Sequence, residues 1–379
     1  MEKENLTSIK IDYLSVTFPL VFLPGDNELF NVHETVRMIA NYMNVRNFEV
    51  AKMDYATNRF KYQYQLGQYI TLRLAGPVND LGDKTVQLEL KGEGCRDFER
   101  RNPEKSWVNF FMFLSQLNAK FRRIDIAIDD FSGDVITMPW LLEKLKNRYY
   151  TSIFNSGYRP IGTPESGMTI SFGTHQSYIE LCIYDKLVQQ KLLKKLVDHE
   201  YWVRYEMRFR ADKAEQVILA LFERYRNADE EMYGIELQKF ACEQLYRILD
   251  VKEDNNYSKA DQKKVKTDGK WLEFLQGVEK GKLASKTNEE LTYEKYFGHV
   301  EPQAAFYLIL RYLQNGKDQN LFELEMYKLM YQHSIFRKDK FQRLNLFLDQ
   351  LHCKTLSDEE LEKLRQEFFG IVSDKELPF

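Results

Sequence analysis

The sequence is poor in cysteine and contains no long run of apolar residues. Its four cysteines, Cys95, Cys182, Cys242 and Cys353, lie far apart and form no C-x-x-C pair. This spacing excludes a disulfide scaffold and offers neither a zinc ribbon nor a redox motif. No apolar stretch approaches the roughly 20 residues that a membrane helix needs, and residues 1–5 lack the pattern of a signal peptide. These absences predict a cytoplasmic protein with no membrane partner.

An excess of positive charge is also missing. The 379 residues include 54 Lys and Arg against 57 Asp and Glu, which gives a net charge of −3, whereas nucleic-acid-binding domains are usually basic. A DNA-binding role therefore requires that the positive charges be sorted onto one face. Aromatic residues make up 14% of the chain and charged residues of both signs 29%, which favours a packed core over disorder. Inspection reveals no internal repeat.

The first two thirds of the chain alternate between strand-like and helical patterns. Strand-like alternation, with a break at Gly67 in the second segment, occurs in residues 11–18, 61–75, 85–91, 122–129, 168–173, 178–184 and 202–210. Single helical segments separate several of these strands. This arrangement predicts an α+β domain over residues 1–250, with a mostly antiparallel sheet and flanking helices.

The composition changes after residue 250. Residues 251–270 are almost entirely polar and predict a linker or long exposed loop. Further on, residues 303–314 and 320–351 have helical periodicity, and 356–361 combines a Ser cap with a Glu three residues later, which is a helix start. We therefore expect an all-helical C-terminal domain over residues 271–379.

Four of the predicted strands have one apolar and one polar face, because side chains alternate across a strand. Their polar faces carry, in chain order, Gln87, Glu89, Lys91, Arg123, Asp125, Asp129, Glu180, Cys182, Tyr184, Lys186, Arg204, Glu206, Arg208 and Arg210. One interpretation is a sheet with a solvated face, which is common in antiparallel proteins. The other is an active site in which carboxylates hold a cation, arginines bind phosphates and a tyrosine beside a lysine is the nucleophile. The pattern alone leaves both open.

Four segments carry a resemblance to a known family. Residues 86–99 (VQLELKGEGCRDFE), 122–133 (RRIDIAIDDFSG), 166–186 (SGMTISFGTHQSYIELCIYDK) and 202–210 (WVRYEMRFR) resemble the replication initiation factor family. That family includes rolling-circle plasmid initiators of the Rep_trans type and MobT-class relaxases of integrative conjugative elements. The resemblance spans roughly residues 10–250 in the right order and implies a rolling-circle nickase-like fold.

The resemblance also implies a reaction. The family's nicking nucleophile matches Tyr184 in the string I-Y-D-K, and its phenolate would attack a scissile phosphate. The product would be a 5′-phosphotyrosyl link and a free 3′-OH, from which rolling-circle replication or conjugative transfer of a mobile element begins. Lys186, two residues on, would lower the pKa of Tyr184 or balance charge on the phosphate. The expected enzyme is a metal-dependent, sequence-specific tyrosine DNA endonuclease and strand transferase.

The metal site implied by the resemblance would consist of carboxylates. Other rolling-circle nickases use a His-hydrophobic-His strand, but none of the six histidines here forms an H-x-H pair. Asp125, Glu89 and Glu206 lie mid-strand on the polar faces and are the expected ligands, with Asp12 and Asp129 in reserve. Oxygen ligands favour Mg²⁺ or Mn²⁺ over zinc. The alternative for each carboxylate is an ion pair with a neighbouring arginine.

The expected partners follow from the same reasoning. The residues expected to contact DNA are Arg96, Arg123, Arg204, Arg208 and Arg210. We expect origin or nic-site DNA, single-stranded or cruciform, as the main partner, with a host helicase and a second copy of the chain as further partners. The alternative function is a non-catalytic DNA-binding regulator of a plasmid or phage on the same scaffold, and a third hypothesis makes residues 271–379 an interaction module.

Overall fold

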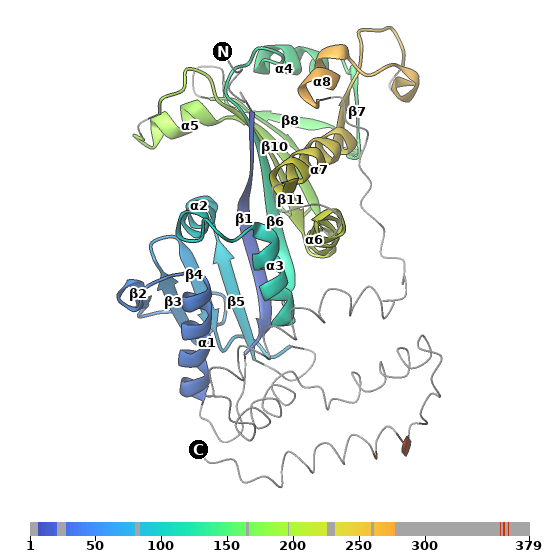
Figure 1. The fold of residues 1–379 in the computed structure, drawn as a ribbon. Coiled ribbons are helices and arrows are strands. Elements are labelled where there is room, and N and C mark those ends of the chain that lie inside the picture. The colour runs from blue at the N-terminus through green and yellow to red at the C-terminus, as the bar shows by residue number, and fades with distance from the viewer. Residues whose placement is uncertain are drawn as a thin grey trace. The chain divides into compact units, whose positions relative to one another are not determined.

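The computed structural model describes residues 7–20, 28–79, 84–163, 167–195, 197–225, 232–258 and 261–276, with isolated positions between 357 and 363. The described residues of the sheet and of the candidate site belong to one compact unit, which lies within residues 1–20 and 34–285. In the described part a ten-stranded antiparallel sheet has the order β2-β3-β4-β5-β1-β6-β11-β10-β9-β8 (Figure 1). The predicted α+β fold with a mostly antiparallel sheet is confirmed. The helical domain expected over residues 271–379 lies almost entirely outside the described residues.

The element bounds place the polar segments of the sequence on strands. The strands are β1 (Thr7–Pro19), β2 (Val50–Lys52), β3 (Tyr62–Leu66), β4 (Ile70–Leu74), β5 (Thr85–Leu90), β6 (Lys120–Asp130), β7 (Tyr150–Ser152), β8 (Tyr158–Ile161), β9 (Thr169–Phe172), β10 (Ile179–Asp185), β11 (Val203–Arg210) and β12 (Leu249–Val251). The helices are α1 (Glu28–Tyr42), α2 (Gly92–Arg101), α3 (Trp107–Gln116), α4 (Met138–Lys146), α5 (Lys186–Leu192), α6 (Asp212–Tyr225), α7 (Tyr233–Ile248) and α8 (Gly269–Phe274), and two short 3₁₀ helices cover Asn47–Glu49 and Gln262–Lys264. β7 and β12 form a separate two-stranded sheet.

The chain follows the same path through the large sheet twice. In the first half, β1 is followed by α1 and by the meander β2-β3-β4-β5, and β5 returns to pair with β1. In the second half, β6 is followed by α4 and, after β7, by the meander β8-β9-β10-β11, and β11 returns to pair with β6. Because β1 and β6 are antiparallel neighbours at the centre, an approximate two-fold axis relates the halves. No repeat is visible in the sequence, so this is a repeat of topology.

The apolar face of the sheet forms the core. Ile124 and Ile126 of β6 are fully buried, and burying each such side chain contributes about 1.5–3 kcal/mol. α6 packs on β6 and β11, and α7 lies beside α6 along the same face (Figure 1). Tyr205 of β11 meets Trp271 and Phe274 of α8, with ring centroids 6.4 and 4.8 Å away. Among the described residues, α6 and α7 thus lie on the apolar side of the sheet, and the polar side chains lie on the opposite side.

Two glycines allow close turns beside the polar face. The hairpin expected around Gly67 is present, since β3 and β4 are joined there and Gly67 adopts a positive φ of 61°. In α2, a Cβ added to Gly94 would lie 2.6 Å from the carbonyl oxygen of Tyr69. Glycine at 94 therefore lets α2 start directly against the end of the hairpin.

The segment expected to be a linker has its own contacts in the described part. Lys144 of α4 bridges Asp254 and Asp268, with its Nζ 2.6 Å from an oxygen of each carboxylate. The indole nitrogen of Trp271 donates to the carbonyl of Leu249 at 3.2 Å. Residues 251–258 and 261–276 thus pack with the sheet-bearing unit, while the proposed domain boundaries at 250 and 270 stay predictions.

We predict that Trp271→Ala destabilises the protein by about 3–5 kcal/mol, because it removes a fully buried indole and leaves a cavity under β11. Chemical denaturation of the full chain measures this loss. The control is Tyr257→Ala, whose ring is 59% exposed and whose substitution should change the free energy of unfolding by less than about 0.5 kcal/mol. Equal effects of the two substitutions would contradict the packing described for α8.

Candidate active site

A β-bulge in β1 directs an additional side chain onto the polar face. The pairing of β1 with β6 passes from Ile11↔Ile126 to Tyr13↔Asp125, so Asp12 is an extra residue. Ile11 and Leu14 on either side are fully buried in the core. Asp12 and Tyr13 between them both contact residues of the polar face, as described below. The bulge therefore places a carboxylate and a phenol side by side where regular alternation allows only one.

Tyr184 lies on β10 next to an acidic residue of β11. Its hydroxyl donates to Oε2 of Glu206 at 2.8 Å, and the side chain is only 9% exposed. Burial and the charge of Glu206 raise the pKa of the Tyr184 phenol well above its usual value. The phenol is therefore protonated at neutral pH and hydrogen-bonded to a group that can accept its proton.

Glu206 is held in the ionised form. Burial opposes its ionisation, but Arg208 and the hydrogen bond from Tyr184 together hold the pKa of the Glu206 carboxyl below its usual value. Arg208 Nε donates to Oε1 of Glu206 at 2.7 Å, while Tyr184 uses the other oxygen. One carboxylate thus binds a guanidinium with one oxygen and a phenol with the other, which places it within hydrogen-bond reach of the phenol proton, the geometric requirement for a general base.

Lys186 is the first residue of α5 and lies beside the tyrosine. Its ammonium nitrogen is 5.5 Å from the centroid of the Tyr184 ring and donates to Gln189 at 2.7 Å. Burial and the charge of Arg204 lower the pKa of Lys186. Lys186 therefore lies beside the ring as expected, but the pKa of the Tyr184 phenol is raised, so the predicted lowering of that pKa by Lys186 is wrong. Its other expected role, balancing charge on a phosphate, stays a prediction.

Arg204 is a buried residue of β11 that binds two carboxylates of the polar face. Its Nη1 lies 2.7 Å from Asp12, and its Nε and Nη2 donate to the two oxygens of Asp129 at 2.6 and 2.9 Å. Lys10 adds a second cation on Asp129 at 2.8 Å. Since the Arg204 side chain is only 5% exposed, these contacts assign it to holding Asp12 and Asp129 in place.

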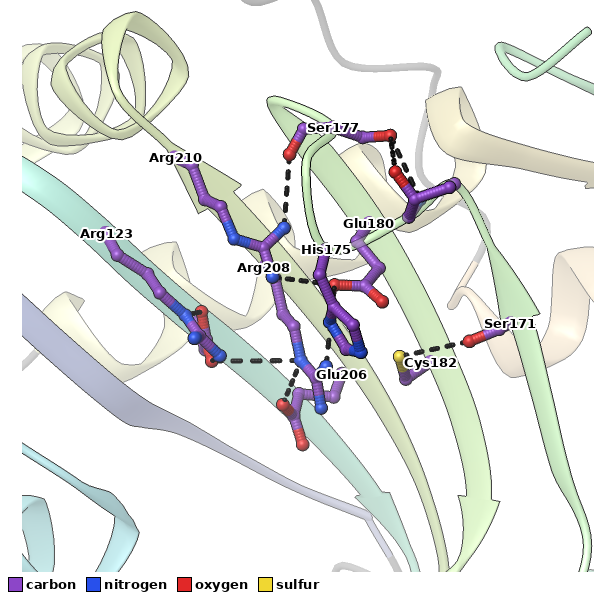
Figure 2. Close-up of polar contacts among 12 residues, drawn as sticks. Arg123, Ser171, His175, Ser177, Glu180, Cys182, Glu206, Arg208 and Arg210 are labelled. Carbon is purple, nitrogen blue, oxygen red and sulfur yellow. Dashed lines mark hydrogen bonds and ion pairs between the residues drawn. The ribbon is translucent and has the colours of Figure 1, made fainter. Parts of the chain in front are cut away.

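Further arginines line the same face along β6 and β11 (Figure 2). Arg123 donates from Nε to Asp125 at 2.8 Å. Arg208 and Arg210 approach the buried Glu180 at 3.5 and 2.7 Å. The side chains of Arg123, Arg208 and Arg210 are 28%, 19% and 17% exposed. These three arginine side chains are therefore paired with carboxylates and still partly exposed.

The residues expected to bind a metal are each paired with an arginine. Glu89 lies 3.0 Å from Arg73, Asp125 is bound by Arg123, and Glu206 by Arg208. Burial raises the pKa of Asp125 to about 6 even so. Within the ranges that the structure describes, no group of three His, Cys, Asp or Glu side chains is arranged to hold a metal ion. As arranged, these donors do not fit a protein-only metal site, and the predicted Mg²⁺ or Mn²⁺ ligands stay a prediction.

Sequence patterns and structure agree on some site residues and differ on others. Tyr184 and Glu206 are in contact. Asp12, a reserve candidate for a metal ligand, binds Arg204, which is the strand partner of Tyr184. Arg96, expected to touch DNA, donates instead to the backbone carbonyl of Ile11 and pairs with Glu99 at 2.8 Å. The contribution of Tyr13 was missed, because only the bulge reveals that it shares a face with Asp12.

Comparisons with known proteins place the chain in a family. A model described as replication initiation factor matches residues 119–321, more than half of the chain, and a model of the rolling circle replication initiation protein N-terminal domain matches residues 8–116. The chain therefore belongs to the replication initiation factor family, as its resemblance predicted. The segment 8–116 covers nearly all of the first half of the sheet, and the segment 119–321 begins with the second half and continues beyond it.

Two individual proteins are similar to this chain. A Bacillus subtilis (strain 168) protein named "Putative DNA relaxase NicK" is 30% identical over 201 residues, which are 51% of this chain and 56% of that protein. The chain thus spans about half the length of this relative. The structure of a rolling circle replication initiator protein from Geobacillus stearothermophilus has a TM-score of 0.54 and 21% identity, covering 74% of this chain and all of that one. The second comparison supports the fold. In the described residues, no helix is long and apolar enough to cross a membrane.

Proposed function

We propose that this protein nicks one strand of DNA at a specific sequence and keeps the cut end on Tyr184 as a 5′-phosphotyrosyl ester. The observation that carries the proposal is the contact between the Tyr184 hydroxyl and the ionised Glu206, on a face lined by partly open guanidinium groups. Membership of the replication initiation factor family and the relaxase name of the NicK relative support it. The nick would start rolling-circle replication or conjugative transfer.

The proposed reaction uses groups already in contact. As the phenol oxygen of Tyr184 attacks the scissile phosphorus, its proton passes to Oε2 of Glu206, 2.8 Å away. The new bond joins the tyrosine oxygen to phosphorus, and the bond from phosphorus to the 3′ oxygen breaks. That oxygen takes a proton from water and leaves as a free 3′-OH, and Glu206 returns its proton to water. Because the phosphate stays esterified, the reverse reaction reseals the strand without ATP.

Charge on the reacting phosphate requires nearby cations. We propose that Lys186 balances the charge that develops on its oxygens, since its ammonium already lies beside the Tyr184 ring. Arg123, Arg208 and Arg210 are the proposed contacts to neighbouring phosphates, because each retains an exposed edge. Arg204 and Arg96 act in this proposal as positioning residues, since their guanidinium groups are committed to Asp12, Asp129 and the backbone of β1.

We predict that Tyr184→Phe abolishes the covalent adduct between the protein and an oligonucleotide. The substitution removes only the attacking oxygen, so affinity for the same oligonucleotide should stay within about threefold, less than the 1 kcal/mol of a typical hydrogen bond. Single-stranded oligonucleotides tiling the DNA that flanks the coding sequence, followed by denaturing gels, detect the adduct. The matched control is Tyr178→Phe, at an exposed tyrosine just before β10. An adduct formed in full by Tyr184→Phe would refute the assignment.

We predict that Glu206→Gln lowers the rate of adduct formation by about 10²–10⁴-fold, because an amide cannot take the phenol proton. The control is Glu180→Gln, which also removes a buried, arginine-paired carboxylate from this face but has no phenol partner. Single-turnover rates for both variants, with thermal unfolding to confirm folding, make the comparison. Equal losses in both variants would show that charge balance, and not proton acceptance, explains the effect.

A divalent cation belongs to the proposal as an expectation from the family resemblance. Mg²⁺ is often bound by one or two carboxylates together with substrate phosphates, which suits a site whose carboxylates are already paired with arginines. We predict that Mn²⁺ titrated calorimetrically into the DNA-free protein shows no saturable binding. Saturable binding should arise when Tyr184→Phe, which cannot cleave, is first loaded with the oligonucleotide. Tight binding by the protein alone would contradict this expectation and support a protein-only site.

A non-catalytic DNA-binding regulator on the same scaffold is the alternative function. The contact between Tyr184 and Glu206 favours the enzyme, since a binding protein has no use for a phenol beside an ionised carboxylate. The adduct experiment separates the two functions. Origin or nic-site DNA, a host helicase, a second copy of the chain and a cytoplasmic location are part of the same proposal.

A further inference from the structure

A second phenol on the polar face has the same kind of carboxylate partner as Tyr184. The hydroxyl of Tyr13, next to the bulge in β1, donates to Oε1 of Glu89 on β5. The other oxygen of Glu89 lies 3.0 Å from Nη1 of Arg73. Glu89 thus accepts from one phenol and one guanidinium, as Glu206 does from Tyr184 and Arg208.

The strand pairing shows that the two glutamates occupy equivalent positions in the two halves of the sheet. Glu89 of β5 pairs with Ser15 of the central strand β1, and Glu206 of β11 pairs with Ala127 of the central strand β6. On their outer sides, Glu89 faces Thr71 of β4 and Glu206 faces Cys182 of β10. The two-fold axis that relates the halves therefore relates the two glutamates.

The phenol and the guanidinium that contact each glutamate come from different strands in the two halves. Two residues beyond Thr71 and Cys182 on the outer strands stand Arg73 and Tyr184, so an arginine occupies the place that the nucleophile has in the second half. The phenol of the first half comes instead from the central strand, at Tyr13. Each half nevertheless supplies a complete set of one carboxylate, one phenol and one guanidinium.

Cations for a phosphate are present at the second set as well. The Arg123 guanidinium carbon lies 4.2 Å from the centroid of the Tyr13 ring, and Arg123 has the most exposed of the three guanidinium groups along this face. Asp125, which binds Arg123, also lies 4.0 Å from Arg208 Nε. Asp125 and Arg208 therefore connect the set around Tyr13 to the set around Tyr184.

The two phenols are too far apart to share one phosphate. β6 and β11 lie between β1 and β10, and three strand spacings amount to about 14 Å. The face can thus engage two phosphates at once. This separation matters because a tyrosine already esterified to DNA has no free oxygen for another cut, whereas release of a finished circle requires a second cleavage.

We propose that Tyr13 is a second nucleophile, which makes the cleavage that ends strand transfer. This inference rests on the proposed function of Tyr184. The Tyr13 proton passes to Glu89, its oxygen bonds to the phosphorus of the second scissile phosphate, and the bond from that phosphorus to the 3′ oxygen breaks. The 3′ oxygen takes this proton from Glu89, and the resulting 3′-OH end moves across the face to the phosphate on Tyr184. Its attack there closes the strand, and its proton passes through Glu206 to the released Tyr184 oxygen.

The test uses the full chain already linked through Tyr184 to a first oligonucleotide. The linked protein is purified, diluted so that two copies seldom meet, and given a second oligonucleotide of the same sequence with a different label. Proteolysis and mass spectrometry then locate the second label. We expect it on Tyr13, together with a ligated DNA product in equal amount. Tyr13→Phe should lose both signals, and Glu89→Gln, which keeps the phenol, should lower the rate about 10²–10⁴-fold.

The outcomes separate the inference from the function on which it rests. A first adduct on Tyr184 with no second label on Tyr13, or ligation undiminished in Tyr13→Phe, overturns the role of Tyr13 and leaves that of Tyr184 intact. Absence of any first adduct overturns both. Tyr257→Phe, at an exposed ring outside the polar face, is the matched control, and thermal unfolding of each variant verifies that it is folded.

Discussion

The polar face depends on pairing buried carboxylates with guanidinium groups. Asp125, Asp129, Glu180 and Glu206 are almost completely buried, and an unpaired buried charge would cost several kcal/mol. Arginines of the same strand or of the next strand bind each of them: Arg123 binds Asp125, Arg204 binds Asp129, Arg208 binds Glu206 and Arg210 binds Glu180. Removing one of these carboxylates therefore leaves a guanidinium without its partner.

The same pairing sets the protonation states that the chemistry needs. Arg208 keeps Glu206 ionised in a buried site, and the ionised Glu206 keeps Tyr184 protonated until a phosphate is bound. In the proposed function, the Tyr184 hydroxyl is therefore protonated at rest but already hydrogen-bonded to its proposed base, Glu206. A bound phosphate would place negative charge near Arg208 and Lys186, so this proposal couples substrate binding to proton transfer through one carboxylate.

Much of this site could be predicted from alternation along single strands. The polar residues of 123–129 and 202–210 share a face as expected, and Tyr184 meets Glu206 from the adjacent strand. Pairings across the sheet could not be predicted, because they depend on strand order and register. The bulge at Asp12 also leaves no sequence signal, and it alone brings Tyr13 onto the polar face. The topological repeat has no clear sequence signal, because even the equivalent segments VQLELK (86–91) and VRYEMR (203–208) share only their Val and Glu.

The antiparallel pairing of β1 with β6 has a consequence for the shape of the substrate. Because β1 and β6 run in opposite directions, the axis that relates the two halves also reverses the strand direction. Equivalent groups in the two halves are therefore arranged in opposite directions along the strands. Under the proposed function, a nucleotide chain that meets both glutamates with the same chemical polarity would have to turn back on itself between them. The two arms of a hairpin, which run in opposite directions, would meet this requirement.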